Sequence, residues 1–183
     1  MDEHQRLIDP VPIARTFAPQ AVNAARQTTI ANMTLSQMAD QKASILMGAT
    51  FLVFTVTLGQ ASKGGPAVVP LLVLGAFAFI AACFAVSVVM PSIRSKRGPG
   101  RAPNMMFFGV ISQFDEEEYI ERMLDNLATD EAMYRMMFRD IWQNAQVLQH
   151  KKYRLLGYAY RSFLAGLIAS AALFAAQYFG VRF

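Results

Sequence analysis

Three long stretches of this sequence carry no charged residue. Ala43–Ser62 and Ser162–Val181 each offer about 20 residues between flanking charges, and Gly64–Ile93 offers about 30, enough for a helix across roughly 30 Å of hydrocarbon. The whole chain is 54% hydrophobic and only 16% charged, which is unusual for a soluble domain. A buried helix of a soluble protein is the alternative for any one stretch, but all three exceed the length expected of it. We therefore expect three transmembrane helices.

The expected fold class is all-α: a multi-pass membrane protein with about three transmembrane helices and a cytosolic helical region continuous with the last span. No proline follows Pro103, so a cytosolic helix from Asp130 is expected to run directly into the third span. The expected segments are an irregular tail at 1–19, a cytosolic helix at 20–42, transmembrane helices at 43–62 and 67–91, a cytosolic linker and helical sensor region at 92–161, and a third transmembrane helix at 162–181.

The basic residues indicate how the chain is oriented. Lys and Arg accumulate in cytoplasmic loops, and here every one except Lys63 and Arg182 falls before the first span or between the second and third. This pattern places the amino terminus in the cytosol. The first ten residues are acidic and lack an apolar core, so we predict no cleavable signal peptide. On the cytosolic side the positive excess is slight, and no nucleic-acid polymer is expected as a partner.

A run of acids marks the expected start of a cytosolic helix. Asp115 is predicted to cap it, with Glu118 answering three residues later, and Thr129 is predicted to cap the helix that follows. The acids of this run also suit the positive end of the helix dipole. We therefore interpret these acids as solvent-exposed residues that stabilise the start of a helix, in preference to a catalytic or metal-binding cluster.

Signatures of catalysis are missing. His4 and His150 lie far apart, without the cysteine or carboxylate spacing of a zinc site, and the glycines after Lys63 match no phosphate-binding loop. We expect no enzymatic activity, no catalytic residues, no metal site and no cofactor. No charged residue lies within any expected span, whereas pumps and transporters normally require ionisable groups inside the membrane.

Four motifs placed around the spans carry a family resemblance. They are ADQKASILMG at the first span, NMMFFG after the second, EEEY at a helix start, and KKYRLLGYAYRSFLAGL before the third. In this order they resemble the transmembrane effectors of Pycsar antiphage systems, over roughly Ala39–Leu173. The absence of an attached nucleotide-binding domain leaves the place of the sensor open.

The resemblance implies a function. In this family a partner pyrimidine cyclase answers phage infection with cyclic CMP or cyclic UMP, and the effector senses that nucleotide and impairs the bacterial inner membrane, causing abortive infection. The expected partners of this chain are thus the lipid bilayer, a cyclic pyrimidine nucleotide made by a partner cyclase, and further copies of itself in a homo-oligomer.

A receptor for such a nucleotide needs a cation for the phosphate, a polar group for sugar or base, and an aromatic surface. We expect Phe107 or Phe108 to pack near the ligand. Lys42, Arg139 or Arg154 is expected to bind phosphate, and Asn104 or Asp40 to bind sugar or base. The full candidate set is Asp40, Lys42, Asn104, Phe107, Phe108, Gly109, Arg139, Asp140, Asn144, Arg154 and Arg161.

Three other interpretations remain open. NMMFF can be an interfacial anchor, with Asp40 paired structurally to Lys42 or to an arginine. The ligand can be a cyclic oligonucleotide, which would favour a wider and more basic site. The chain can also be a non-toxic membrane adaptor whose cytosolic helices dock a partner protein.

Overall fold

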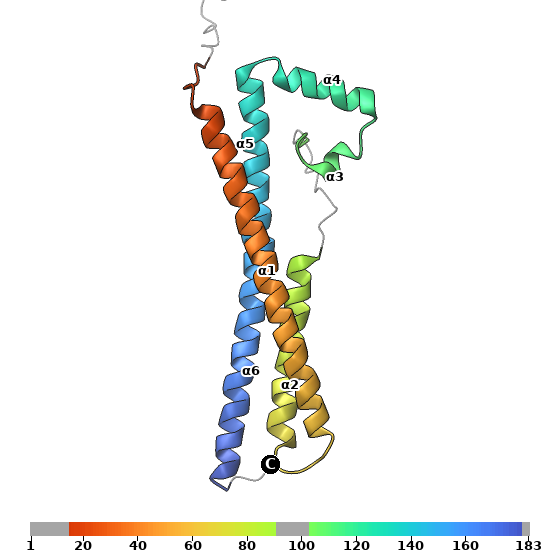
Figure 1. Ribbon diagram of the computed structural model, residues 1–183, viewed down its shortest axis with the longest axis vertical. Coiled ribbons are helices and arrows are strands. Elements are labelled where there is room, and N and C mark those ends of the chain that lie inside the picture. The colour runs from red at the N-terminus through yellow and green to blue at the C-terminus, as the bar shows by residue number, and fades with distance from the viewer. Residues whose placement is uncertain (1–14, 91–102, 181–183) are drawn as a thin grey trace, which may run out of the picture. The chain divides into compact units, whose positions relative to one another are not determined.

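The computed structural model describes residues 15–90 and 103–180, and every regular element in these ranges is a helix (Figure 1). The elements are α1 (Ala21–Ala61), α2 (Val68–Val89), α3 (Phe108–Ile111), α4 (Glu116–Leu127), α5 (Asp130–Val147), the π-helix η2 (Leu148–Tyr153) and α6 (Arg154–Tyr178). Parts of the predicted amino-terminal tail and linker, and the predicted ends of the second and third spans, lie outside the described residues.

Three helices are long and apolar enough to cross a membrane: α1, α2 and the unbroken run Asp130–Tyr178. Their most apolar windows have mean hydropathies of 1.6, 2.6 and 1.5, yet no more than 33% of any window is buried within the chain. Helices of a soluble core would bury most of such a surface. The predicted all-α fold with three spans, the last continuing from a preceding helix, is confirmed.

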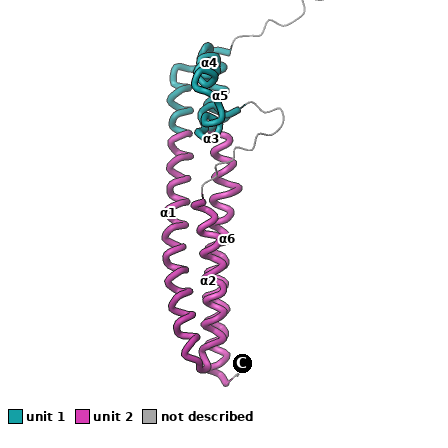
Figure 2. Tube along the Cα trace, turned by 90° about the vertical axis from the view of Figure 1, so that its right-hand side faces the viewer, with its two compact units in different colours: residues 1–28, 97–140 teal, residues 29–96, 141–183 magenta. Residues whose placement is uncertain are grey.

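The chain divides into two compact units, coloured separately in Figure 2. Unit 1 comprises residues 1–28 and 97–140, and unit 2 comprises residues 29–96 and 141–183. The long helix α1 therefore contributes its first turns to unit 1 and the remainder to unit 2. Each unit is described below by itself.

Unit 2 is a packed set of three helices, α1, α2 and α6, which lie side by side (Figures 1 and 2). Its interior consists of small layers that each take one residue from every helix: Ala43, Val88 and Leu156 in one layer, and Leu46, Ala85 and Ala159 in the next. Because each layer contains at least one alanine, the helix backbones approach closely, as is common in membrane-spanning helices.

The contact between α2 and α6 is especially tight at Gly166. A Cβ atom added to this glycine would lie 2.4 Å from the Cβ atom of Phe77 on α2. One turn further along α6, the buried Ser170 hydroxyl donates a hydrogen bond of 3.0 Å to the Pro70 carbonyl oxygen. Gly166 and Ser170 lie four residues apart on one face of α6, and their small side chains allow α6 to pack closely against α2.

Unit 1 has a smaller interior. The Phe17 and Tyr134 rings lie 4.4 Å apart, and Met105, Val110 and Met136 are buried. By contrast, α4 buries no residue, and its apolar side chains Ile120, Leu124 and Leu127 are exposed.

The predicted capping box at the start of α4 is wrong. Asp115 occupies the N-cap position with extended backbone, but its side chain makes no capping hydrogen bond. Glu118 instead pairs forward with Arg122 at 2.9 Å, because residues four apart are neighbours on a helix and opposite charges attract. The second predicted cap does form, since the Thr129 hydroxyl oxygen accepts the Ala132 N–H at 3.2 Å.

Candidate functional site

A buried polar pair anchors the segment before α3 to α5 within unit 1. The Asn104 amide donates a hydrogen bond of 2.9 Å to the Asp140 carboxylate, and the two residues are only 3% and 6% exposed. The Asn104 side-chain oxygen also accepts the backbone N–H of Met106 at 3.0 Å, which holds the turn that leads into α3. This pair fixes the backbone of Pro103–Met105 beside α5.

We expect Asp140→Ala to destabilise unit 1 by about 1–3 kcal/mol, because it leaves the buried Asn104 amide without its carboxylate partner. Chemical denaturation of the purified protein in detergent, followed by circular dichroism, measures this change. Asp130→Ala is the matched control, since Asp130 is exposed in the first turn of the same helix. Equal effects of the two substitutions would contradict the structural role of the pair.

A pocket of about 220 Å³ lies next to this anchor. It is lined by Pro103, Met105, Arg122, Asp125, Asn126 and Arg139. The three lining residues of α4 follow the i, i+3, i+4 spacing that places side chains on one helix face. Arg139 comes from α5, so the pocket joins two helices and the segment that precedes α3.

The polar groups of this pocket suit a small anionic ligand. The Arg139 guanidinium donates one long hydrogen bond, 3.5 Å, to the Pro103 carbonyl oxygen. The Arg122 guanidinium is paired with Glu118 and lies 5.1 Å from the centre of the Phe114 ring. Two guanidinium groups can bind a phosphate through paired hydrogen bonds, while Asp125 and Asn126 offer acceptors and a donor for neutral polar groups.

A third arginine of unit 1 is already engaged. Arg135 pairs with Glu131 at 2.5 Å, one turn apart on α5. Its hydrogen bond lowers the pKa of the Glu131 carboxyl; desolvation opposes this shift, and the charges of Arg135 and Arg15 reinforce it. Arg135 does not line the pocket, although it lies one turn from Arg139.

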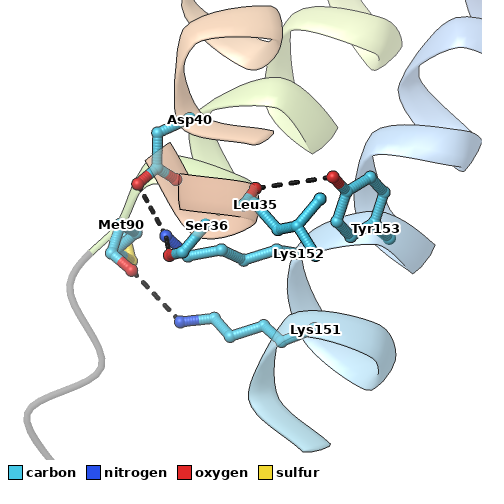
Figure 3. A network of polar contacts seen from close by, with 7 residues as sticks. All are labelled: Leu35, Ser36, Asp40, Met90, Lys151, Lys152 and Tyr153. Atoms are coloured by element: carbon cyan, nitrogen blue, oxygen red, sulfur yellow. Dashed lines mark hydrogen bonds and ion pairs between the residues drawn. The ribbon is translucent and has the colours of Figure 1, made fainter. Parts of the chain in front are cut away.

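A second polar cluster lies in unit 2, between η2 and the helices around it (Figure 3). The Lys152 ammonium donates hydrogen bonds to Asp40 at 2.6 Å and to the Ser36 hydroxyl at 2.7 Å. On either side of Lys152, the Tyr153 hydroxyl reaches the Leu35 carbonyl oxygen at 3.4 Å, and the Lys151 ammonium reaches the Met90 carbonyl oxygen at 3.1 Å. Three consecutive residues of η2 therefore bind α1 and the end of α2.

Comparison with known protein families shows to which family the chain belongs. Residues 23–178 match the family described as the Pycsar effector protein domain. The chain belongs to this Pycsar effector family. The predicted resemblance is thereby confirmed, and this Pycsar effector is a membrane protein of antiphage defence. Searches of curated proteins and of solved structures find no match to the chain.

The residues predicted to bind ligand fall in both units of this Pycsar effector. Unit 1 holds Asn104, Phe107, Phe108, Gly109, Arg139 and Asp140, and unit 2 holds Asp40, Lys42, Asn144, Arg154 and Arg161. Of these, only Arg139 lines the pocket of unit 1. The Phe107 and Phe108 rings lie 4.9 Å apart, and Phe108 is 64% exposed. The part that each residue plays in ligand binding stays a prediction.

The structure also identifies partners for the predicted residues. Asp40 pairs with Lys152, and not with Lys42 or an arginine as the structural interpretation expected. Lys42 is exposed, and the Arg154 guanidinium lies 6.0 Å from the centre of the Tyr158 ring. Asn104 and Asp140, which the prediction named separately, bind each other.

Sequence reasoning missed several residues of the two polar sites. Arg122, Asp125 and Asn126 of the pocket were not singled out, although their spacing places them on one face of the predicted α4. Lys152 was recognised only as part of the motif before the third span. Its position in the sequence could have indicated its role. Lys152 lies four residues from each of the apolar Leu148 and Leu156, and both leucines are buried, so this face of the helix is turned toward the interior.

Proposed function

We propose that this Pycsar effector senses cyclic CMP or cyclic UMP made by a partner cyclase, and that it responds by impairing the bacterial inner membrane. Its amino terminus and unit 1 lie in the cytosol in this proposal. The observation that carries it is the pocket of unit 1, where Arg122 and Arg139 stand beside Asp125 and Asn126 in a chain of this family.

The chemistry of the ligand supports this use of the pocket. A cyclic mononucleotide carries one phosphate charge, which Arg139 and Arg122 bind through charge-assisted hydrogen bonds. Its free 2′-hydroxyl and the edge of its base need acceptors and donors, and Asp125 and Asn126 supply both. The Phe114 ring, 5.1 Å from the Arg122 guanidinium, is the aromatic surface nearest to these groups, whereas the exposed Phe108 does not line the pocket.

The size of the pocket favours a mononucleotide over a cyclic oligonucleotide. Its volume of about 220 Å³ is below the roughly 300–1,000 Å³ of typical ligand pockets. In unit 1 the carboxylates outnumber the arginines, which disfavours a ligand with many phosphates and a nucleic-acid polymer. These features support our choice of a cyclic mononucleotide over a cyclic oligonucleotide as the signal.

A nucleotide changes the state of the protein only if it binds one state more tightly than the other. We propose that the active state is a homo-oligomer, joined in the membrane through small residues of the spans and in the cytosol through the exposed apolar side of α4. No catalytic step and no cofactor enter this mechanism.

Leakage of dye from liposomes carrying the full chain tests the proposal. We expect leakage with cyclic CMP or cyclic UMP, and none with cyclic AMP, cyclic GMP or cyclic dinucleotides. Leakage with cyclic dinucleotides alone would assign the effector to oligonucleotide signalling. Silence with every nucleotide, from folded and inserted protein, would favour an adaptor that docks a partner protein.

A further inference from the structure

The polar cluster around Lys152 coincides with an irregularity of the helix that carries it. Residues Leu148–Tyr153 form a π-helix between the α-helices α5 and α6. π-Helical turns are rare, because their wider hydrogen-bond pattern is less favourable than that of an α-helix, and those that occur are frequently at functional sites. Contacts outside the helix must therefore stabilise η2, and the hydrogen bonds of Lys151, Lys152 and Tyr153 do so from three successive positions.

The ion pair at the centre of these contacts is partly removed from water. The Lys152 side chain is 18% exposed and that of Asp40 is 37% exposed. Removing one partner from such a pair leaves the other charge poorly solvated. As long as the pair holds, η2 is tied to α1 at Asp40 and Ser36 (Figure 3).

The cluster is nevertheless one hydrogen bond short. The second carboxylate oxygen of Asp40, Oδ1, is buried and finds no hydrogen-bond partner among the described residues. Buried polar atoms are seldom left in this condition, and each exception calls for an explanation. An arrangement in which Oδ1 gains a donor, or in which the carboxylate turns to water, would relieve this cost.

We propose that Ser36, Asp40 and Lys152 form a latch that holds the effector in its resting state, and that activation releases it. Conversion of η2 to α-helix changes the rotation between α5 and α6 and moves Lys152 away from Asp40. The pocket residue Arg139 and Lys152 belong to one uninterrupted helical run, so a rotation of α5 acts directly on the latch. The proposed latch regulates the membrane-impairing activity, and the proposal therefore rests on the function proposed above.

Leakage without nucleotide is the decisive measurement, made on the full chain in liposomes of phosphatidylethanolamine and phosphatidylglycerol. Lys152→Met and Asp40→Asn are each expected to raise this basal leakage by about 10- to 150-fold, the equivalent of one charge-assisted hydrogen bond. The double variant Asp40→Lys with Lys152→Asp is expected to return it toward the wild-type value. Lys151→Met, which removes a neighbouring charge that contacts a carbonyl oxygen, is the control and should have a smaller effect.

Hydrogen exchange at the amides of residues 148–153 supplies a readout that does not depend on leakage. In the latch variants we expect altered exchange at these amides, because they change hydrogen-bond partners when η2 becomes α-helix, and unchanged exchange in α2. If exchange rises throughout the protein, the charge-swapped variant decides: recovery of low leakage supports the latch, and no recovery overturns it.

The latch and the nucleotide assignment fail in different ways. If wild-type protein ignores every nucleotide while the single variants leak by themselves, the assigned signal is wrong and the latch stands. If wild-type protein responds to a nucleotide but Lys152→Met and Asp40→Asn show wild-type basal leakage and wild-type exchange in η2, the latch is wrong. If neither the wild type nor any variant leaks, hydrogen exchange in η2 decides. Exchange rates in the variants equal to those of the wild type overturn the latch, and a change of rate confined to η2 supports it.

Discussion

Replacing Arg139 by alanine is expected to weaken binding of the cyclic nucleotide by about 10- to 150-fold, the cost of one hydrogen bond between charged groups. Arg139 makes one long hydrogen bond to the Pro103 carbonyl oxygen and lines the pocket, so its guanidinium can turn to a phosphate at little cost. The loss is expected in affinity, with the maximum leakage at saturating nucleotide retained.

Isothermal titration of the detergent-solubilised protein measures this affinity directly. The matched control is Arg135→Ala, which removes an arginine one turn away on α5 that is paired with Glu131 and does not line the pocket. We expect its affinity to stay within about twofold of the wild type, because a distant exposed charge contributes little. Equal losses of affinity in the two variants would mean that nucleotide binding depends on the overall charge of the protein and not on this pocket.

Gly166→Ala is expected to destabilise the packed spans by about 1–3 kcal/mol. The added Cβ atom would lie 2.4 Å from the Phe77 Cβ atom, which is held next to its own backbone and cannot swing aside. The helices α2 and α6 must then separate, which also lengthens the hydrogen bond from Ser170 to the Pro70 carbonyl oxygen. Gly166→Leu should prevent stable packing altogether.

Gly157→Ala provides the control on the same helix. A Cβ atom at this glycine would meet nothing within 4 Å, so the substitution changes only helix propensity. It is expected to stabilise the protein by about 0.5–1 kcal/mol, because alanine loses less backbone entropy in a helix than glycine. Unfolding in sodium dodecyl sulfate, followed by circular dichroism, should thus shift in opposite directions for the two variants. Shifts in the same direction would show that Gly166 is not a close-packing position.

The division of charge between the units is consistent with their proposed roles. The described part of unit 2 contains one acid, Asp40, and several lysines and arginines. Such cations suit the anionic surface of a membrane. Unit 1 carries an excess of carboxylates, so a pocket lined by two arginines favours a specific anionic ligand over general attraction to anions.

The sequence by itself determined the architecture of this protein and its family. Three uncharged stretches have the length of a membrane span, and that length depends on the thickness of hydrocarbon and the rise of a helix, with no need for tertiary contacts. The absence of proline after Pro103 was enough to predict the unbroken run through the third span. The order of four short motifs was enough to indicate the Pycsar effectors, which the match over residues 23–178 confirms.

Only the tertiary structure decided how the polar residues are paired. Asp40 and Lys152 lie 112 positions apart, and Asn104 and Asp140 lie 36 apart, so their contacts depend on how separate helices pack. A carboxylate in the sequence has several lysines and arginines as possible partners, and helix periodicity orients each side chain relative to its own helix alone. The π-helix η2 was equally beyond prediction, because its local sequence is compatible with an α-helix and its less favourable geometry is maintained by contacts with α1 and α2.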